Sequence, residues 1–152
     1  MFNFDKTQIP YDELDKNIVE LVRFLNSFDG VFTVGSCGGH TDPKPGQTPA
    51  NEWLVIFKLE FIDGQVSLGG WLALEFLTWA INNDLRGGGF DVRLMSFSAP
   101  PYLNEPGQTI NFGIEGRSVD PAKIVQCLVR FRNAFFISAA GKIVPMPEFE
   151  KY

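Results

Sequence analysis

The sequence has few of the residues from which disulfide frameworks and metal centres are built. Its 152 residues include two cysteines, Cys37 and Cys127, and one histidine, His40. Two cysteines cannot make the disulfide network that small secreted domains need. Cys37 and His40 have a Cys-x-x-His spacing, but a structural zinc site needs four ligands and the nearest carboxylate in the sequence is Asp42. We therefore predict no metal ion.

Basic residues and long hydrophobic runs are also scarce. Lysine and arginine total 13 against 18 acidic residues, giving a net charge of −5. An acidic chain lacks the general attraction for phosphates that most nucleic-acid binders use, so a nucleic-acid partner is not expected. The longest apolar stretch, residues 71–81, is interrupted by Glu75 and Thr78 and is too short to span a bilayer. With no signal-peptide pattern at the N-terminus, we expect a cytoplasmic protein without membrane contact.

Apolar and aromatic residues, in contrast, are plentiful. Hydrophobic residues make up 45% of the chain, and 15 of its residues are phenylalanine. This length and composition suit one globular domain, residues 1–152, with a large core. The phenylalanines and tryptophans could also supply an apolar surface for a homodimer.

The hydrophobic periodicity predicts a single α+β domain with helix-strand-strand repeated twice and a helix after the second copy. The helix over 71–83 is apolar almost all round, so we expect it to be the most buried. Both predicted strand pairs are joined by loops containing Pro-Gly-Gln-Thr, at 45–48 and 106–109. The repeat indicates either an internal duplication or the ordinary recurrence of Pro-Gly turns. The predicted helices are 12–28, 71–83 and 121–133, and the predicted strands are 31–36, 53–61, 90–98 and 110–115.

The strongest candidate site is the turn that follows the first predicted strand. Its glycines can expose successive backbone N–H groups to a carboxylate or phosphate, and Lys44 nearby can add positive charge. The alternative is a tight turn with no ligand, because paired glycines are ordinary turn residues. Arg93 joins the candidates because it would be the counterpart of Val34 if the two repeats pair about a two-fold axis. The candidate ligand-binding residues of the turn are Ser36, Cys37, Gly38, Gly39 and His40.

Thiol chemistry is a second interpretation of the same turn. A nucleophilic Cys37 would need a base, and His40 is the only histidine in the sequence. No third residue that would orient this histidine is evident from the sequence. A cysteine at a strand end is also commonly a small buried side chain. We therefore assign no catalytic residue.

The turn and the helix before it resemble the tRNA wybutosine-synthesising protein 3 family, the Taw3-like methyltransferases. The resemblance covers residues 14–40 and rests on Leu25-Asn26-Ser27, Thr33 and Ser36-Cys37-Gly38-Gly39. In the family, a helix ending in a Leu-Asn-type step leads into a strand closed by Ser-Cys-Ser-Gly-Arg. Here Gly38 stands in place of the second serine and His40 in place of the arginine.

The resemblance implies a small duplicated α+β domain. It also implies S-adenosylmethionine as cofactor, methyl transfer to a modified tRNA base, and a site near Ser36, Cys37 and Gly39. Two functional hypotheses follow. In the first, the protein binds an anionic small molecule or nucleotide-like ligand at the Ser36–His40 turn and is a methyltransferase-like enzyme. In the alternative it is a homodimeric interaction module without a small-molecule ligand or an activity.

Overall fold

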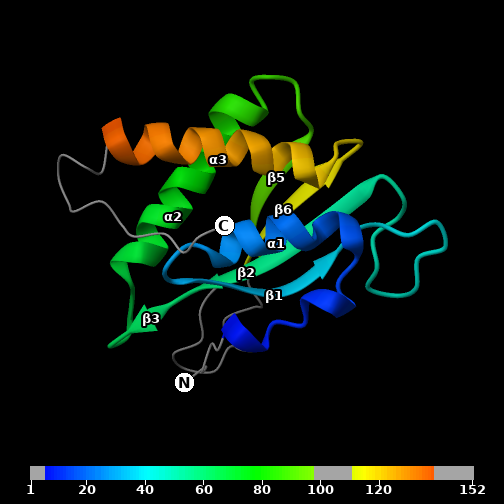
Figure 1. The fold of residues 1–152 in the computed structure, drawn as a ribbon, viewed down its shortest axis with the longest axis horizontal. Coiled ribbons are helices and arrows are strands. Elements are labelled where there is room, and N and C mark those ends of the chain that lie inside the picture. The colour runs from blue at the N-terminus through cyan, green and yellow to red at the C-terminus, as the bar shows by residue number, and fades with distance from the viewer. Residues whose placement is uncertain (1–5, 98–110, 139–152) are drawn as a thin grey trace.

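The computed structural model describes residues 6–97 and 111–138, which form helices and one main sheet (Figure 1). Among these residues no helix is long and apolar enough to cross a membrane. The elements are the 3-10 turns η1 (Lys6–Gln8), η2 (Tyr11–Glu13) and η3 (Lys16–Ile18), helix α1 (Val19–Asn26), strands β1 (Val31–Cys37), β2 (Glu52–Leu59), β3 (Phe61–Ile62) and β4 (Gln65–Val66), helix α2 (Leu68–Trp79), the π-helix η4 (Ala80–Leu85), strands β5 (Val92–Phe97) and β6 (Asn111–Arg117), and helix α3 (Pro121–Ser138).

The main sheet has four strands in the order β1-β2-β6-β5, and every neighbouring pair is antiparallel. The fold is therefore α+β, as predicted. The order sets the β1-β2 pair beside the β5-β6 pair, with β1 and β5 at the two edges. This order does not by itself show an internal duplication, because any two adjacent antiparallel strand pairs can give it. The second Pro-Gly-Gln-Thr lies outside the described residues, so the internal duplication stays a prediction.

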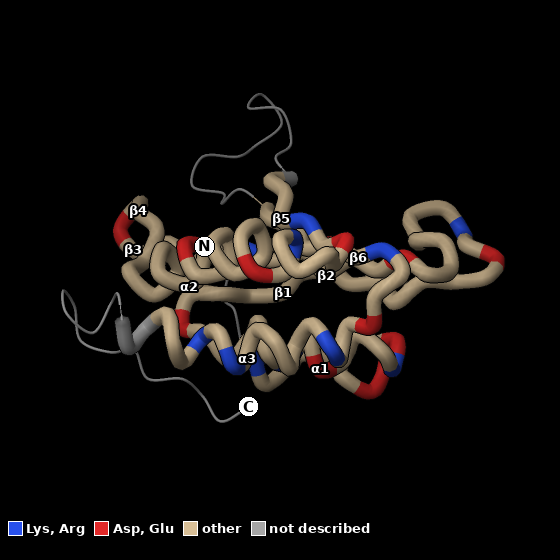
Figure 2. The backbone as a smooth tube through the Cα atoms, turned by 90° about the horizontal axis from the view of Figure 1, so that it is seen from above, with Lys and Arg blue, Asp and Glu red and all other residues tan. Residues whose placement is uncertain are grey.

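Helices α1 and α3 lie side by side and form a layer along the sheet (Figure 2). Strand β2 contributes to the core between these helices and the sheet. Its buried residues alternate with partly buried ones and are Trp53, Val55, Phe57 and Leu59. This alternation is the pattern of a strand with one face against helices. Helix α2 joins the same core through Phe76, whose ring stacks on that of Phe28 at 5.8 Å.

Two predictions about the helices are wrong. The segment 12–28 does not form one helix: α1 begins only at Val19, because Leu14 and Asp15 are extended, with ψ angles of 154° and 133°. Helix α2 is not the most buried, since Leu68 and Trp71 are 59% and 55% exposed. Helix α1 is more enclosed, with five of its eight residues buried, against four of twelve in α2.

Candidate functional site

A bulge in edge strand β1 sets the direction of the side chains at the candidate turn. Thr33 pairs with Phe57 and Gly35 with Ile56, so β1 has one residue more than β2 between these pairs. One extra residue moves every later side chain to the opposite face of the sheet. Beyond the bulge, Ser36 lies opposite the buried Val55 and faces the helices. Cys37 lies opposite Leu54 and points to the other face.

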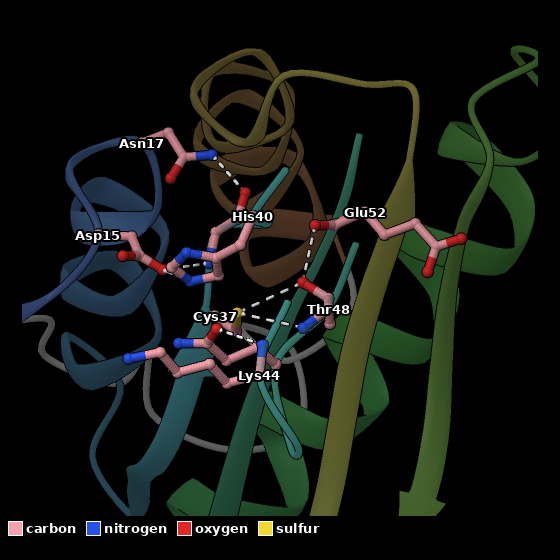
Figure 3. Close-up of polar contacts among 9 residues, drawn as sticks. Asp15, Asn17, Cys37, His40, Lys44, Thr48 and Glu52 are labelled. Carbon is pink, nitrogen blue, oxygen red and sulfur yellow. Dashed lines mark hydrogen bonds and ion pairs between the residues drawn. The ribbon is translucent and has the colours of Figure 1, made fainter. Parts of the chain in front are cut away.

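Asp15 reaches the turn from the segment before α1. The Gly38 N–H donates to the Asp15 Oδ2 at 2.7 Å, and the His40 Nε2 lies 3.3 Å from the same oxygen (Figure 3). The Asn17 side-chain amide donates to the Gly38 carbonyl oxygen at 2.9 Å. The Asp15 and His40 side chains are 36% and 32% exposed, so solvent screens their pairing only partly. Residues 15–17 thus hold the turn from one side.

Thr48 holds the turn from the other side. Its backbone N–H and its hydroxyl oxygen both lie 3.4 Å from the Cys37 sulfur, and the hydroxyl also lies 2.9 Å from the Glu52 carbonyl oxygen (Figure 3). A hydroxyl carries one proton, so it donates to only one of these two acceptors at a time. The His40 N–H donates to the Thr48 carbonyl at 3.0 Å. The loop after β1 therefore folds back onto the turn.

These contacts lower the pKa of the Cys37 thiol below its usual value. Burial of the sulfur acts in the opposite direction and raises the pKa, as does the negative charge of Asp15. The hydrogen bonds from Thr48 and from the Gly39 N–H stabilise the thiolate, and together they outweigh both effects. The structure favours an ionised sulfur more than an ordinary cysteine site does.

The three successive N–H groups of the turn all have acceptors within the protein. Gly38 donates to Asp15, Gly39 to the Cys37 sulfur and His40 to the Thr48 carbonyl. An external anion would have to displace one of these groups to reach the backbone. The binding of a ligand anion by this backbone stays a prediction, with the side chains of His40 and Lys44 as the remaining donors.

The structure supplies the third residue that was not evident from the sequence. Ligand atoms of Asp15, Cys37 and His40 lie within 4.8 Å of one another, so Asp15, and not Asp42, is the carboxylate of this cluster. No pattern in the sequence indicates this role, because Asp15 fits the polar surface of the helix predicted over 12–28. The carboxylate meets a turn 23 residues away only because the chain is extended at Leu14 and Asp15.

The structure does not bring Arg93 to the turn. Arg93 lies on β5, the edge strand opposite β1, and β2 and β6 separate them. It pairs in register with Glu115, and its guanidinium lies 4.0 Å from the Asp91 carboxylate. Arg93 and Thr48 both line a pocket of about 20 Å³, which is large enough for a single water molecule.

Two clefts adjoin the turn. A cleft of about 310 Å³ includes Ser36 and the bulged part of β1 in its lining. A larger cleft of about 510 Å³ begins at Gly38 and extends to the loop before α3. Asn51 and Ser118 on its rim have φ angles of 70° and 55°, a left-handed conformation that is uncommon outside glycine. The larger cleft is lined by Asn17, Gly38, Asn51, Trp53, Ser118, Val119, Asp120 and Pro121.

The chain is partly similar to archaeal enzymes of one kind. A stretch of 51 residues is 37% identical to the tRNA(Phe) 7-((3-amino-3-carboxypropyl)-4-demethylwyosine(37)-N(4))-methyltransferase 2 of Pyrococcus furiosus, covering 31% of this chain and 25% of that enzyme. The enzymes of the same name from Pyrococcus abyssi and Pyrococcus horikoshii are 34% identical over 53 residues and 31% over 51 residues.

The similarity confirms the partial resemblance found in the sequence, but the chain spans only about a quarter of the length of the curated relatives it matches. No family model matches the chain, and no solved structure matches it.

Proposed function

We propose that the protein is a methyltransferase-like enzyme that binds S-adenosylmethionine, or a related nucleotide-like ligand, beside the Ser36–His40 turn and acts on modified tRNA. The observation that carries the proposal is the similarity to three archaeal enzymes whose names describe an N(4)-methyltransferase of tRNA(Phe). The resemblance found in the sequence includes the Ser-Cys-Gly-Gly motif, and in the structure this motif borders two clefts.

The larger cleft is the better candidate for the ligand. Its volume of about 510 Å³ lies within the range typical of small-molecule sites. Among the described residues that line it, Asp120 is the only one with a formal charge. A carboxylate disfavours a polyphosphate but attracts the cationic sulfonium and ammonium groups of S-adenosylmethionine. Asn17, Asn51 and Ser118 can provide neutral hydrogen bonds to its ribose and base.

S-adenosylmethionine would supply an electrophilic methyl group, and the chain would bind and orient it. The left-handed Asn51 and Ser118 support a binding role, because strained backbone clusters at ligand sites. They also hold each other in place, since the Ser118 N–H donates to the Asn51 carbonyl oxygen at 2.7 Å.

Calorimetric titration with S-adenosylmethionine tests the proposal, and two glycine variants sharpen it. A Cβ added at Gly38 would collide with the side chains of Asn17 and Asp15, whereas a Cβ at Gly35 would meet nothing within 4 Å. We expect Gly38→Ala to weaken binding at least about tenfold, which corresponds to ~1.4 kcal/mol. Gly35→Ala, three residues earlier in β1, should bind as the wild type does. Absence of binding by the wild-type protein would refute the proposal.

The tRNA part needs its own test because the chain is acidic. Binding to wybutosine-pathway tRNA should weaken steeply as salt is added if phosphates contribute to the interface. Transfer of a labelled methyl group to that tRNA would establish the activity. If the protein binds S-adenosylmethionine but neither binds nor methylates the tRNA, a different methyl acceptor must be sought.

The homodimeric interaction module remains the second candidate. It is favoured by the exposed side chains of Leu68 and Trp71 on α2, since large apolar surfaces on a folded chain commonly mark contacts. Light scattering coupled to size exclusion separates the two hypotheses. A strict monomer that binds S-adenosylmethionine rules the module out, while a dimer without ligand binding supports it.

A further inference from the structure

The cluster at the turn combines a carboxylate, a thiol and an imidazole from two distant segments. The oxygen, sulfur and nitrogen ligand atoms of Asp15, Cys37 and His40 lie within 4.8 Å of one another, and the Asp15 Oδ2 and His40 Nε2 are 3.3 Å apart. We propose that these residues bind a transition-metal ion of the zinc type, with three protein ligands and a fourth position open to water or substrate. This inference does not depend on the proposed methyltransferase function.

The distances fit such an ion after small side-chain movements. Tetrahedral zinc has bonds of about 2.0–2.3 Å to nitrogen, oxygen and sulfur, which places neighbouring ligand atoms about 3.4–3.6 Å apart. The pair formed by Asp15 and His40 is already near that separation. Since no pair in the cluster is wider than 4.8 Å, each must close by at most about 1.4 Å, which side-chain rotation can supply at a partly exposed turn.

The surrounding hydrogen bonds hold the ligands as the second shell of a metal site does. The Gly38 N–H donates to the Asp15 Oδ2, the oxygen that lies 3.3 Å from the His40 Nε2, and holds it at the cluster while its second lone pair stays available. The Thr48 backbone N–H and hydroxyl lie 3.4 Å from the Cys37 sulfur and hold it in place. The thiolate is the form of cysteine that binds metals. Outer partners of this kind orient the ligands and contribute strongly to affinity.

A metal also explains two features that a nucleophilic cysteine leaves unexplained. Cys37 as a whole residue is only 9% exposed, so a bulky electrophile reaches it poorly whereas a single ion needs little access. The Asp15 carboxylate and the Cys37 sulfur, which both carry negative charge when ionised, lie within 4.8 Å of each other. A divalent cation between a thiolate and a carboxylate turns this repulsion into attraction.

The ligand types select the class of ion. Magnesium and calcium take oxygen ligands, whereas thiolate and imidazole favour zinc and related transition metals. Three protein ligands with one open position are typical of catalytic sites and not of structural ones.

Cobalt(II) provides the test because its thiolate complexes absorb light where zinc complexes are silent. After removal of metals with a chelator, titration with cobalt should give one ion per chain, with a sulfur-to-cobalt charge-transfer band that zinc abolishes. Cys37→Ser should remove that band, and the matched variant Cys127→Ser should keep it. Asp15→Asn and His40→Gln should weaken cobalt binding at least about tenfold while the thiol is intact.

The proposal is overturned if the wild type shows no charge-transfer band, or if Cys37→Ser keeps the band. Unchanged cobalt affinity in both Asp15→Asn and His40→Gln would also overturn it. Circular dichroism checks that each variant folds. If Cys37→Ser does not fold, the cobalt affinities of Asp15→Asn and His40→Gln decide the question. Since the assay contains no S-adenosylmethionine or RNA, its outcome is independent of the proposed methyl transfer.

Discussion

Asp15→Ala is expected to destabilise the fold by about 2 kcal/mol in the absence of metal, a large effect for a half-exposed residue. The Gly38 N–H donates to the Asp15 carboxylate at 2.7 Å, and hydrogen bonds to charged groups contribute about 1.5–3 kcal/mol. The side chain is 36% exposed, so the lower part of that range applies. The contact with His40 adds at most about 0.5 kcal/mol, because water screens partly exposed pairs.

Urea unfolding in the presence of a chelator measures this loss without a contribution from bound ions. Asp12→Ala is the matched control. Asp12 lies on an exposed turn of the same segment, and its substitution removes the same charge. We expect the control to stay within about 0.5 kcal/mol of the wild type. If the two variants unfold at the same urea concentration, Asp15 does not hold the turn and the account of the site fails.

Gly116→Ala should cost about 1–3 kcal/mol in thermal or urea unfolding, since a Cβ there would overlap the buried ring of Trp53. A neutral effect would mean that the ring has room to move. Arg132→Lys should cost about 1–2 kcal/mol in the same assay, because the buried guanidinium donates to the Ser27 hydroxyl at 3.0 Å and lies over an aromatic ring. In metal-free protein, the pKa of the Cys37 thiol should lie below its usual value. Thiolate absorbance in a Cys127→Ser background measures this pKa, and Thr48→Val should raise it. Because the pKa is lower in the folded than in the unfolded protein, ionisation of Cys37 adds stability as the pH rises towards the pKa of the unfolded thiol. This added stability is lost below the pKa of the folded protein. A thiol that titrates at its usual pKa contradicts the prediction.

Local patterns predicted the elements whose structure depends on local contacts. The periodicity predicted a strand over 53–61, and the structure has β2 at Glu52–Leu59, where alternate residues are buried because a half-buried strand has period two. The helix predicted over 121–133 begins at Pro121 in the structure, where the Asp120 carboxylate accepts a hydrogen bond from the Ala122 N–H at 3.0 Å. Both signals lie within a few residues of the feature that they specify.

The site was predicted only in part, because its geometry depends on distant contacts. The turn itself followed from its glycines and from the strand before it. The bulge in β1 did not, although it decides that Cys37 faces away from the helices. Asp15 was missed because no local pattern distinguishes a carboxylate on a helix surface from one that lies before the helix and reaches Gly38.

The two positions where this chain departs from the methyltransferase motif are both needed for the cluster. A side chain at Gly38, where the family has serine, would push against Asp15 and Asn17 and keep the carboxylate away. At His40 the family has arginine, whose guanidinium has no lone pair to offer a metal. His40→Arg should therefore abolish cobalt binding while preserving an ion pair with Asp15. If His40→Arg still binds S-adenosylmethionine as the wild type does, binding of this ligand does not need the metal site, and the metal site is specific to this chain. Cobalt binding that survives in His40→Arg would show that the histidine is not a ligand.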